Sequence, residues 1–598
     1  MKKQSFIGTI KAILFSMRLA LRYQEGRRYC GMKLFLAILN VIYPLATTLL
    51  PGLIINELME KRRISVLTSY VLLLGVIPLM NTAFGLLTNR YMLKLSKEIE
   101  LIYTSQWYLM RMKMDYEHLE NPKMEELHDR CLNTYISVAE IIDQIIALFA
   151  TVINVIALSS IVITFNPLIL VVILVMMWVN FVVTKHTQQK LFQANKGLER
   201  YDRMLSGLTF KMIKYQNGKE FRLFDLGQYL VDRYRSIKKE LIGHEIENRR
   251  ISHTSGMVVA ITSFLQQIIL YAFLIFQILY RGLSVGDLTI CLSAGNQFAS
   301  RIKSLFDAYL ALYRRSLSIQ ELKEYLSIPV LQYQTGNRTP HFDRNSVIEF
   351  KNVSFRYPGS DRYALKNLNL TLRGNEKLCV VGANGSGKTT FVKLLTRLYL
   401  VQEGEILLNG INIKEYDYLK YQRLFAAVFQ DFIQYNFSLK DNIVLNQEYD
   451  QVRLDKVCKN TGLTSLVEKL PQGYETQVGK FVDPNGFDPS GGESQRIAIA
   501  RACYRGGDIF LLDEPTAALD PIAEYDIYTQ FNQMITDKCA VLVTHRLSAV
   551  QLADKVAVFK NGSVVEYGSH QELYSKGGIY TEMFDKQAQF YRESSESL

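Results

Sequence analysis

The pattern of hydrophobic residues divides the chain into two halves of different character. Up to about residue 310, long apolar runs carry few charges, whereas beyond about residue 345 short apolar runs alternate with polar turns. A helix needs about 20 mostly apolar residues to cross a membrane. The first half offers six such runs, at 34–58, 66–90, 138–164, 167–185, 255–280 and 285–310. The second half follows the pattern of a soluble α/β domain.

The charges between these runs predict how the chain is oriented in a membrane. Segments 91–137 and 186–254 are rich in Lys and Arg, whereas the short "TFNP" stretch (164–167) has none. Because Lys and Arg gather in cytoplasmic segments, we expect both long segments and both termini in the cytoplasm. The "EKRR" stretch (60–63) then falls outside, which counts mildly against this topology.

Each long cytoplasmic segment is helix-like but contains a break. Pro122 ends "DYEHLENP" (115–122), and Gly218 lies within "YQNGKEFRLFD" (215–225). A Pro or Gly between helical stretches allows a sharp turn and a short cross-helix. Such cross-helices could press on a soluble domain, although two ordinary solvated loops would explain the same residues.

The predicted spans also contain uncharged amides. They are Asn40, Asn81, Asn154, Asn180, Gln266, Gln267, Asn296 and Gln297. Buried amides in a membrane usually bond to neighbouring helices, and the alternative is that some of them line a polar pathway. No series of intramembrane carboxylates suggests a proton relay.

Composition and charge narrow the classes of function. The chain has 598 residues, a net charge of +12 and seven scattered cysteines without a CxxC pair, which predicts reduced, structural thiols. No basic stripe with interleaved aromatic residues indicates nucleic-acid binding, and membrane topology explains the positive charge better. Residues 1–30 lack a cleavage site and read as an amphipathic helix along the inner membrane face.

The second half contains a phosphate-binding pattern. In "KLCVVGANGSGKTTFVKLL" (377–395), Gly382, Gly387, Lys388 and Thr389 have the spacing G-x-x-x-x-G-K-[ST] between a strand-like and a helix-like run. Glycines there let backbone N–H groups converge on phosphate oxygens without a Cβ in the way. Lys388 would bridge the β- and γ-phosphates, and Thr389 would give its hydroxyl to Mg²⁺.

A second stretch supplies the other half of such a site. "DIFLLDEPTAALD" (508–520) contains four apolar residues that predict a buried parallel strand, followed by Asp513 and Glu514. Because α/β sheets bind ligands at the carboxyl ends of their strands, Asp513 would hold Mg²⁺ through water. Glu514 is then placed to act as general base on the attacking water.

The stretch "GFDPSGGESQRIAIARA" (486–502) leaves one question open. Ser490 followed three residues later by Glu493 predicts a capping box at a helix start. The free N–H groups of that helix end could cap only themselves or could also bind a phosphate.

In this order, the motifs resemble those of ATP-binding cassette (ABC) transporters of the exporter type, over nearly the whole chain. The resemblance implies an α-helical transmembrane domain of six helices fused to an α/β P-loop ATP-binding cassette domain. The implied domains are an N-terminal segment at 1–30, a transmembrane domain at 31–325 with coupling helices near 115–122 and 217–225, a linker at 326–347, a nucleotide-binding domain at 348–585 and a tail at 586–598.

The resemblance also implies roles for single residues. Tyr357 in "VSFRYPG" would stack on adenine, and Gln430 in "AAVFQDF" would lie near Mg²⁺ and the attacking water. His545 in "LVTHRLS" would contact the γ-phosphate, and Asp520 in "AALD" would cross to the opposite subunit. The expected catalytic residues are Glu514, His545 and Gln430, and the expected Mg²⁺ residues are Thr389, Gln430 and Asp513. The expected ATP contacts are Tyr357, Gly382, Asn384, Gly385, Ser386, Gly387, Lys388, Thr389, Thr390, Ser490, Gly491, Gly492, Glu493 and Asp520.

For the capping-box helix, the resemblance implies an answer to the open question. In this family two cassettes stack head to tail, so Ser490, Gly491 and Gly492 would bind the γ-phosphate held by the other subunit's phosphate loop. One cassette and about six spans make the chain a half-transporter, which must form a homodimer or a heterodimer. Pro489 and Glu493 depart from the family's usual Leu and Gln. The extra carboxylate should weaken, without abolishing, the grip on ATP.

The expected function is ATP-driven export of a peptide or an amphipathic small molecule by alternating access. The expected location is a bacterial cell membrane, in contact with lipid, with the nucleotide-binding domain in the cytoplasm. A lipid flippase is the alternative, and an uptake system is less favoured because no substrate-binding domain is visible. The "ALDPIAE" run (518–524) resembles that of some peptide exporters of bacterial gene clusters.

Overall fold

The computed structural model describes residues 6–60, 62–165, 167–214, 217–281, 284–331, 336–514, 529, 538–544, 550 and 553–586. The chain splits into two compact units. The first unit is Met1–Met110 with Glu126–Ile328, and the second is Arg111–Glu125 with Pro329–Leu598. Residues 111–125 therefore belong to the second unit, although the chain on both sides of them belongs to the first.

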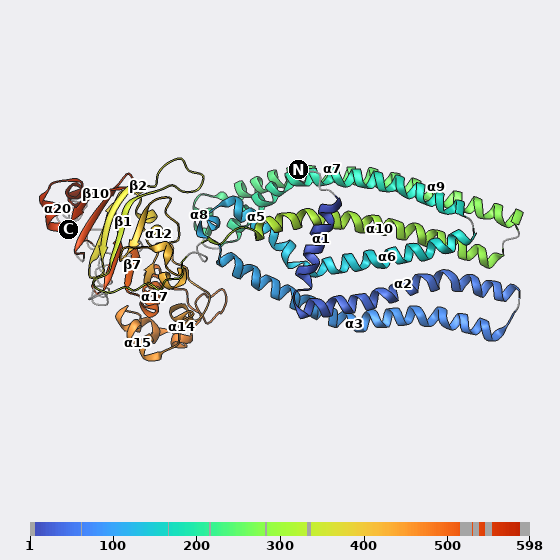
Figure 1. Cartoon of the computed structure of the whole chain (residues 1–598), viewed down its shortest axis with the longest axis horizontal. Coiled ribbons are helices and arrows are strands. Elements are labelled where there is room, and N and C mark those ends of the chain that lie inside the picture. Colours follow the sequence, from blue (N-terminus) through green and yellow to red (C-terminus); the bar gives the residue numbers. More distant parts are fainter. Residues whose placement is uncertain are drawn as a thin grey trace. The chain divides into compact units, whose positions relative to one another are not determined.

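Among the residues that the structure describes, six long helices form most of the first unit, and each contains one predicted span. They are α2 (Gln24–Met59), α3 (Ile64–Met112), α6 (Val138–Phe165), α7 (Pro167–Ile213), α9 (Leu226–Arg281) and α10 (Val285–Leu326). Helix α7 packs against α9, and α10 packs against α2 and α6 (Figure 1). Since a helix rises about 1.5 Å per residue, helices of 42 to 56 residues such as α10 and α9 are longer than a bilayer is thick.

Four of the six predicted spans meet the length and apolarity that crossing a membrane requires. Within the described residues these are in α2, α3, α6 and α9, while α7 offers the shorter apolar stretch Ile173–Thr187. Helix α10 carries Arg301, Lys303 and Asp307 along its predicted span, which lowers its apolarity. The apolar window of α3 has none of its residues buried inside the chain, as expected of a surface that meets lipid.

Small residues bring α2 and α10 close together. A Cβ added to Gly52 would lie 2.5 Å from the carbonyl oxygen of Gly286, so both positions need glycine. Ser284 caps α10 by accepting from the Asp287 N–H, and its hydroxyl donates to Asn56 of α2 at 2.7 Å. The two helix ends are thereby held in one register.

The "EKRR" stretch that counted against the topology is partly neutralised. Arg63 donates from Nε and Nη2 to the two carboxylate oxygens of Glu57, at 2.9 and 3.0 Å. Glu57 is buried, and the pairing is bidentate. One of the three cations is therefore offset by a carboxylate of the same chain.

Helix α1 (Phe6–Ala20) covers part of the bundle. Ala12 is buried in a cluster with Ile141 and Ile145 of α6 and Leu312 of α10. Its other face exposes Leu14. An amphipathic helix forms in the predicted segment, and its position along a membrane face stays a prediction.

Short helices lie in both predicted breaks, within segments 91–137 and 186–254. Helix α4 (Tyr116–Leu119) precedes α5 (Pro122–Ile136), and α8 (Gly218–Leu223) precedes α9. Helix α4 lies in the stretch that belongs to the second unit, whereas α8 belongs to the first.

In the part of the chain that the structure describes, the second unit contains two sheets. The first has the order β2 (Leu365–Arg373), β1 (Val347–Phe355), β4 (Glu403–Leu408), β5 (Ile411–Asn412), with antiparallel neighbours. The second has the order β10 (Ser563–Gly568), β9 (Lys555–Lys560), β3 (Lys377–Gly382), β8 (Cys539–Val543), β7 (Ile509–Asp513), β6 (Phe425–Val428). From β9 to β6 all neighbours are parallel.

Helices α12 (Lys388–Leu395), α17 (Gly491–Arg505) and α20 (His570–Ser575) pack against strands of the second sheet, and α13 (Tyr418–Gln422) contributes Tyr421 to the core. Helices α14 (Leu439–Val444), α15 (Gln451–Asn460) and α16 (Thr464–Lys469) form a separate group, in which α14 and α15 pack on α17. Phe391 of α12 is buried between Phe350 of the first sheet and Phe559 of the second. The core of this unit therefore lies around α12.

Strand order brings the two predicted halves of the site together. Strand β8 pairs with both β3 and β7, so the carboxyl ends of β3 and β7 lie on the same edge of the sheet. Gly382 ends β3 and Asp513 ends β7. The α/β fold predicted from the sequence is present, and the predicted phosphate loop and acidic residues follow strands that end on that edge.

Candidate functional site

The phosphate loop, residues 382–389, connects β3 to α12 through a tight turn. Gly387 has φ +108°, and an added Cβ would lie 2.7 Å from Leu365 Cδ2. At Gly382, an added Cβ would lie 2.4 Å from the carbonyl oxygen of Phe559. Gly382 also has a positive φ, of +154°, so glycine is required at both positions by close packing and by the backbone.

The loop presents cationic and donor groups without a capping carboxylate. Helix α12 starts after Gly387 with no side-chain cap and no acidic residue in its first turn, so its first N–H groups lack intrahelical partners. Lys388 is 6 % exposed, and its Nζ donates to the carbonyl oxygens of Gly382 and Ala383, at 2.9 and 3.2 Å. Ser386 Oγ is buried and finds no hydrogen-bond partner among the described residues. This cradle fits a polyphosphate.

The acidic half of the site lies at the end of β7. Burial, and then the charge of Glu514, raise the pKa of Asp513 to about 6, against the opposing effect of Lys388. The same burial lowers the pKa of Lys388, which both carboxylates oppose. Gln430 Nε2 donates to Glu514 Oε2 at 3.1 Å. The structure therefore brings Gln430, Lys388, Asp513 and Glu514 into one site.

Glu514 has an unusual backbone. Its φ is +47°, although it is not glycine, and its N–H donates to Val543 of β8 at 2.9 Å. Such a conformation costs free energy and recurs at functional sites. The carboxyl of Asp513, the hydroxyl of Thr389 and the amide of Gln430 are oxygen ligands of the kind that Mg²⁺ takes.

Tyr357 lies beside the first turn of α12. Its hydroxyl and Thr390 Oγ1 are 3.0 Å apart. Its ring packs edge-to-face with Phe355 and Tyr399, at centroid distances of 5.2 and 5.4 Å. The ring is half-buried, which leaves part of its surface open to a stacking partner.

The capping box predicted at Ser490 is confirmed. Ser490 Oγ accepts from the Glu493 N–H at 3.3 Å, and Glu493 Oε2 accepts from the Ser490 N–H at 2.8 Å. The Ser490 hydroxyl also lies 2.8 Å from Glu493 Oε2, to which it donates. Gly491 and Gly492 supply the first N–H groups of α17.

Two predicted site residues cannot be located. Asp520 and His545 lie outside the described residues, as does the "ALDPIAE" run. Asn384 and Gly385 lie in the exposed part of the phosphate loop.

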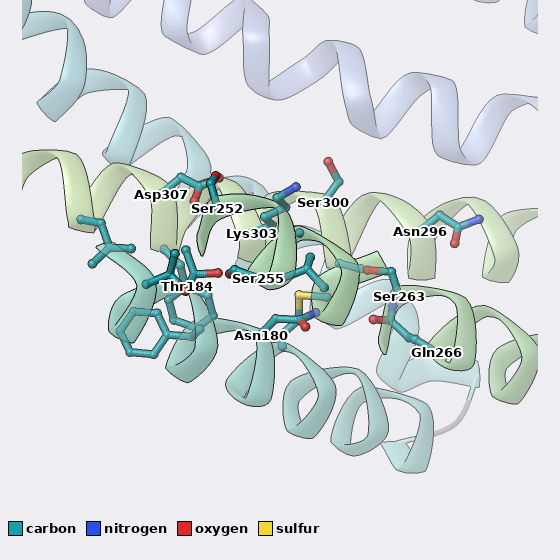
Figure 2. Close-up of a pocket in the computed structure, with 18 of the residues that line it drawn as sticks. Asn180, Thr184, Ser252, Ser255, Ser263, Gln266, Asn296, Ser300, Lys303 and Asp307 are labelled. Atoms are coloured by element: carbon teal, nitrogen blue, oxygen red, sulfur yellow. The ribbon is translucent and has the colours of Figure 1, made fainter. Parts of the chain in front are cut away.

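A pocket of about 460 Å³ lies in the first unit between α7, α9 and α10 (Figure 2). Four of the eight predicted amides line it: Asn180, Gln266, Gln267 and Asn296. Gln266 is 4 % exposed, and its Oε1 has no hydrogen-bond partner among the described residues. All four amides line the pocket, and Asn180 also accepts from the Thr262 hydroxyl of α9, so bonding between helices and a polar lining occur together.

Sequence reasoning missed the other polar residues of this pocket. They are Thr184 and Thr187 of α7, Ser252, Ser255 and Ser263 of α9, and Ser300, Lys303 and Asp307 of α10. On α9 the pocket positions 252, 255, 259, 263 and 266 recur every three or four residues. Four of these five positions are polar and one is Val259, and that helical period was a readable signal for a polar face. Twelve of the 19 lining residues have polar side chains.

The chain matches known proteins over both units. The family model described as "ABC transporter" matches residues 365–517. The subtilin transport ATP-binding protein SpaT of Bacillus subtilis is 32% identical over 74% of this chain and 72% of its own length. The chain therefore belongs to the ABC transporter family. It is a membrane exporter that hydrolyses ATP.

Other similar proteins agree on the class. The nisin transport ATP-binding protein NisT of Lactococcus lactis is 25% identical over 95% of both chains. An ATP-dependent lipid A-core flippase of Haemophilus ducreyi is 33% identical over 56% of this chain and 57% of its own length. A solved bacterial Atm1-family ABC exporter with ATP bound superposes with a TM-score of 0.80, at 22% identity, over 94% of this chain and 99% of that one. This last likeness identifies the exporter fold.

Proposed function

We propose that this exporter is one half of a dimer, in which ATP is held between the phosphate loop of one subunit and helix α17 of the other. The two-unit exporter fold and the single cassette support this arrangement. Lys388 and the N–H groups of α12 would hold the phosphates, with Tyr357 beside the adenine. Ser490, Gly491 and Gly492 would meet the γ-phosphate from the second subunit.

Glu514 would take the proton of the attacking water, oriented by Gln430. Their hydrogen bond and the strained backbone of Glu514 support these roles. Mg²⁺, when bound by Thr389, Asp513 and Gln430, would neutralise charge on the phosphate oxygens. His545 and Asp520 keep the roles predicted for them. The domain bounds and the coupling roles of α4 and α8 are part of the same proposal.

We further propose that the cargo is a peptide, held in the polar pocket of α7, α9 and α10. The observation that carries this choice is the pocket's lining. Gln266 Oε1 offers an acceptor to a donor such as a peptide N–H, and the hydroxyls of α9 can serve its carbonyls. For phosphate head groups, a lipid would need more cations than Lys303, whose charge is balanced by that of Asp307 in the same lining. Two relatives named for subtilin and nisin transport agree with this choice.

A leucine substitution tests the peptide proposal. We expect Gln266→Leu to raise the peptide concentration for half-maximal ATPase stimulation about tenfold, because a peptide N–H would lose its acceptor. The probes are subtilin and nisin, for whose transport two relatives are named, and the control is basal ATPase, which should stay unchanged. Asn154→Leu is the matched variant, since Asn154 is another buried amide whose oxygen has no hydrogen-bond partner among the described residues, but it lies outside the pocket. Stimulation by lipid A and not by peptide would favour the flippase instead.

The choice between homodimer and heterodimer has its own test. Every described catalytic position is occupied by a residue suited to its role, so two identical sites could work. We expect the purified single gene product to hydrolyse ATP. A lack of activity until a second half-transporter is added would establish a heterodimer.

A further inference from the structure

One lysine of the second unit touches both helix α4 and the tyrosine proposed to hold adenine. Lys393, on α12, lies one turn beyond the phosphate loop. Its Nζ is 2.5 Å from Glu120 Oε1, at the end of α4. The lysine side chain is 17 % exposed and the glutamate 36 %. The ion pair is thus partly shielded from solvent, unlike most surface pairs.

The same ammonium lies over three tyrosine rings. Its distances to the ring centroids are 5.4 Å for Tyr116, 5.3 Å for Tyr357 and 5.7 Å for Tyr399. These distances are within reach of a cation–π attraction. Tyr116 belongs to α4 and Tyr357 to the predicted adenine site, so one charge is shared between the two.

Tyr399 provides a second connection between helix α4 and Tyr357. Tyr399 packs edge-to-face with Tyr116 at 5.8 Å and with Tyr357 at 5.4 Å. Its hydroxyl donates to Glu120 Oε2 at 2.5 Å. Both oxygens of Glu120 are therefore engaged by groups that also contact Tyr357.

This contact stays charged across the neutral pH range. Burial alone would raise the pKa of Glu120, but the hydrogen bonds from Lys393 and Tyr399 outweigh burial and lower it. Removing either charge would leave the other half-buried without its partner. The strength of the ion pair should therefore depend on the positions of the surrounding tyrosine rings and not on pH near neutrality.

We propose that Lys393 is a positioning residue that makes the hold on helix α4 depend on a base stacked against Tyr357. The proposal rests on the proposed place of adenine at Tyr357. A base that restrains this ring also restrains the aromatic surroundings of the Lys393 ammonium, and so strengthens its pair with Glu120. By linkage, a firmly held α4 must in turn favour the base. The adenine end of ATP, and not only its phosphates, then acts on the segment that joins α3 to α5.

Hydrogen exchange of the full-length protein in Glu514→Gln form tests this proposal, because that form should hold ATP without turnover. The probes are ATP with Mg²⁺ and tripolyphosphate with Mg²⁺, which lacks a base. We expect ATP to slow exchange in residues 116–119 at least fivefold more than tripolyphosphate does. Lys393→Met should reduce this difference to less than twofold, and Lys393→Arg should restore most of it.

A matched variant separates positioning from mere docking. Asp115 Oδ2 accepts from the Leu331 N–H at 2.9 Å, which ties α4 to the same unit without touching Tyr357. Asp115→Asn should speed exchange with both ligands and keep their ratio. A Lys393→Met protein that retains the full ratio would overturn the proposal.

The failure of the proposed adenine site would look different. Tyr357→Ala should weaken ATP binding while leaving tripolyphosphate binding unchanged. Equal ATP binding in that variant would remove the adenine site and the present proposal with it. If Tyr357→Ala weakened ATP binding as expected, but Lys393→Met did not change the difference in exchange between the two ligands, only the coupling through Lys393 would be overturned.

Discussion

Two helix ends of the second unit are proposed to meet the same phosphate, and they are built in opposite ways. Helix α12 begins after Gly387 with a left-handed residue, no side-chain cap and a buried cation, Lys388. Helix α17 begins with Ser490, whose N–H and hydroxyl both donate to Glu493. The start of α12 leaves its donors for an external anion, whereas at the start of α17 a carboxylate of the same turn already accepts from the N–H and the hydroxyl of Ser490.

The difference shows which side of the site resists ATP. An uncapped helix start has unsatisfied N–H groups, so an arriving phosphate gains their full attraction. At α17 an arriving phosphate must first draw the Ser490 hydroxyl away from Glu493, next to a like charge. Nucleotide should therefore bind at α12 first, and the approach of α17 should be the weaker and more adjustable step.

The largest effect should come from filling the glycine turn at α12. In Gly387→Ala, a Cβ would lie 2.7 Å from Leu365 Cδ2 on a backbone with φ +108°, so the loop must shift. We expect ATP affinity to fall on the order of 100-fold, from strain and lost N–H contacts of about 2–3 kcal/mol. Equilibrium binding of ATP measures it. Gly410→Ala is the control, because Gly410 has φ +78° but nothing within 4 Å of an added Cβ. Equal losses in both variants would contradict the role given to the loop.

The next effect should come from α17. Ser490→Ala removes both the cap and the hydroxyl proposed to meet phosphate, and we expect ATPase to fall roughly 10- to 100-fold, as for a lost bond of about 1.5–3 kcal/mol to a charged group. Binding of ATP to one subunit should change little. Ser569→Ala is a close control, since Ser569 and Glu572 form the same capping box at α20. Both variants should lose about 1 kcal/mol of stability. If Ser569→Ala lowered ATPase equally, the loss would be structural.

A smaller effect should appear in the pH dependence of ATP turnover, and it concerns the α12 side of the site. Asp513, beside Lys388, has its pKa raised from 3.8 to about 6 by burial and by Glu514. In the folded protein it therefore keeps a proton between about pH 4 and 6 that the unfolded chain has lost, so its contribution to stability falls as pH rises through that range. Because the proposed Mg²⁺ contact needs the carboxylate, kcat/KM for ATP should rise about tenfold per pH unit below 6 and level off above it. A plateau that extends down to pH 5 would contradict this role of Asp513.

The features readable from the sequence were those set by short spacing. The capping box at Ser490, the phosphate loop between a strand and a helix, and the apolar run before Asp513 each depend on neighbours within a few residues. Local spacing also gave the breaks at Pro122 and Gly218, where helices α5 and α8 now begin.

Contacts between distant segments were not readable in this way. Glu120 and Lys393 are 273 positions apart, and nothing around either residue identifies its partner. The polar pocket needs faces of three helices, each of which reads separately as a tolerated row of serines, threonines or amides. The capping box was predicted, but the second donation, from the Ser490 hydroxyl to Glu493, depends on a rotamer that spacing does not specify.

The smallest predicted effect bears most directly on the comparison. Glu493→Gln keeps an acceptor for the Ser490 N–H, so the capping box can persist, but it removes the negative charge from the start of α17. Two like charges separated by about 5 Å repel by about 1 kcal/mol near water, which predicts an ATP concentration for half-maximal ATPase that is about fivefold lower. The gain should appear in ATP-driven dimerisation of the Glu514→Gln protein and not in binding of ATP to the separate subunit, because α12 is unchanged. Glu572→Gln makes the same change in the box at α20 and should alter neither quantity. If Glu493→Gln instead left dimerisation unchanged, the carboxylate would be a cap alone, and the two helix ends would differ in structure but not in their hold on ATP.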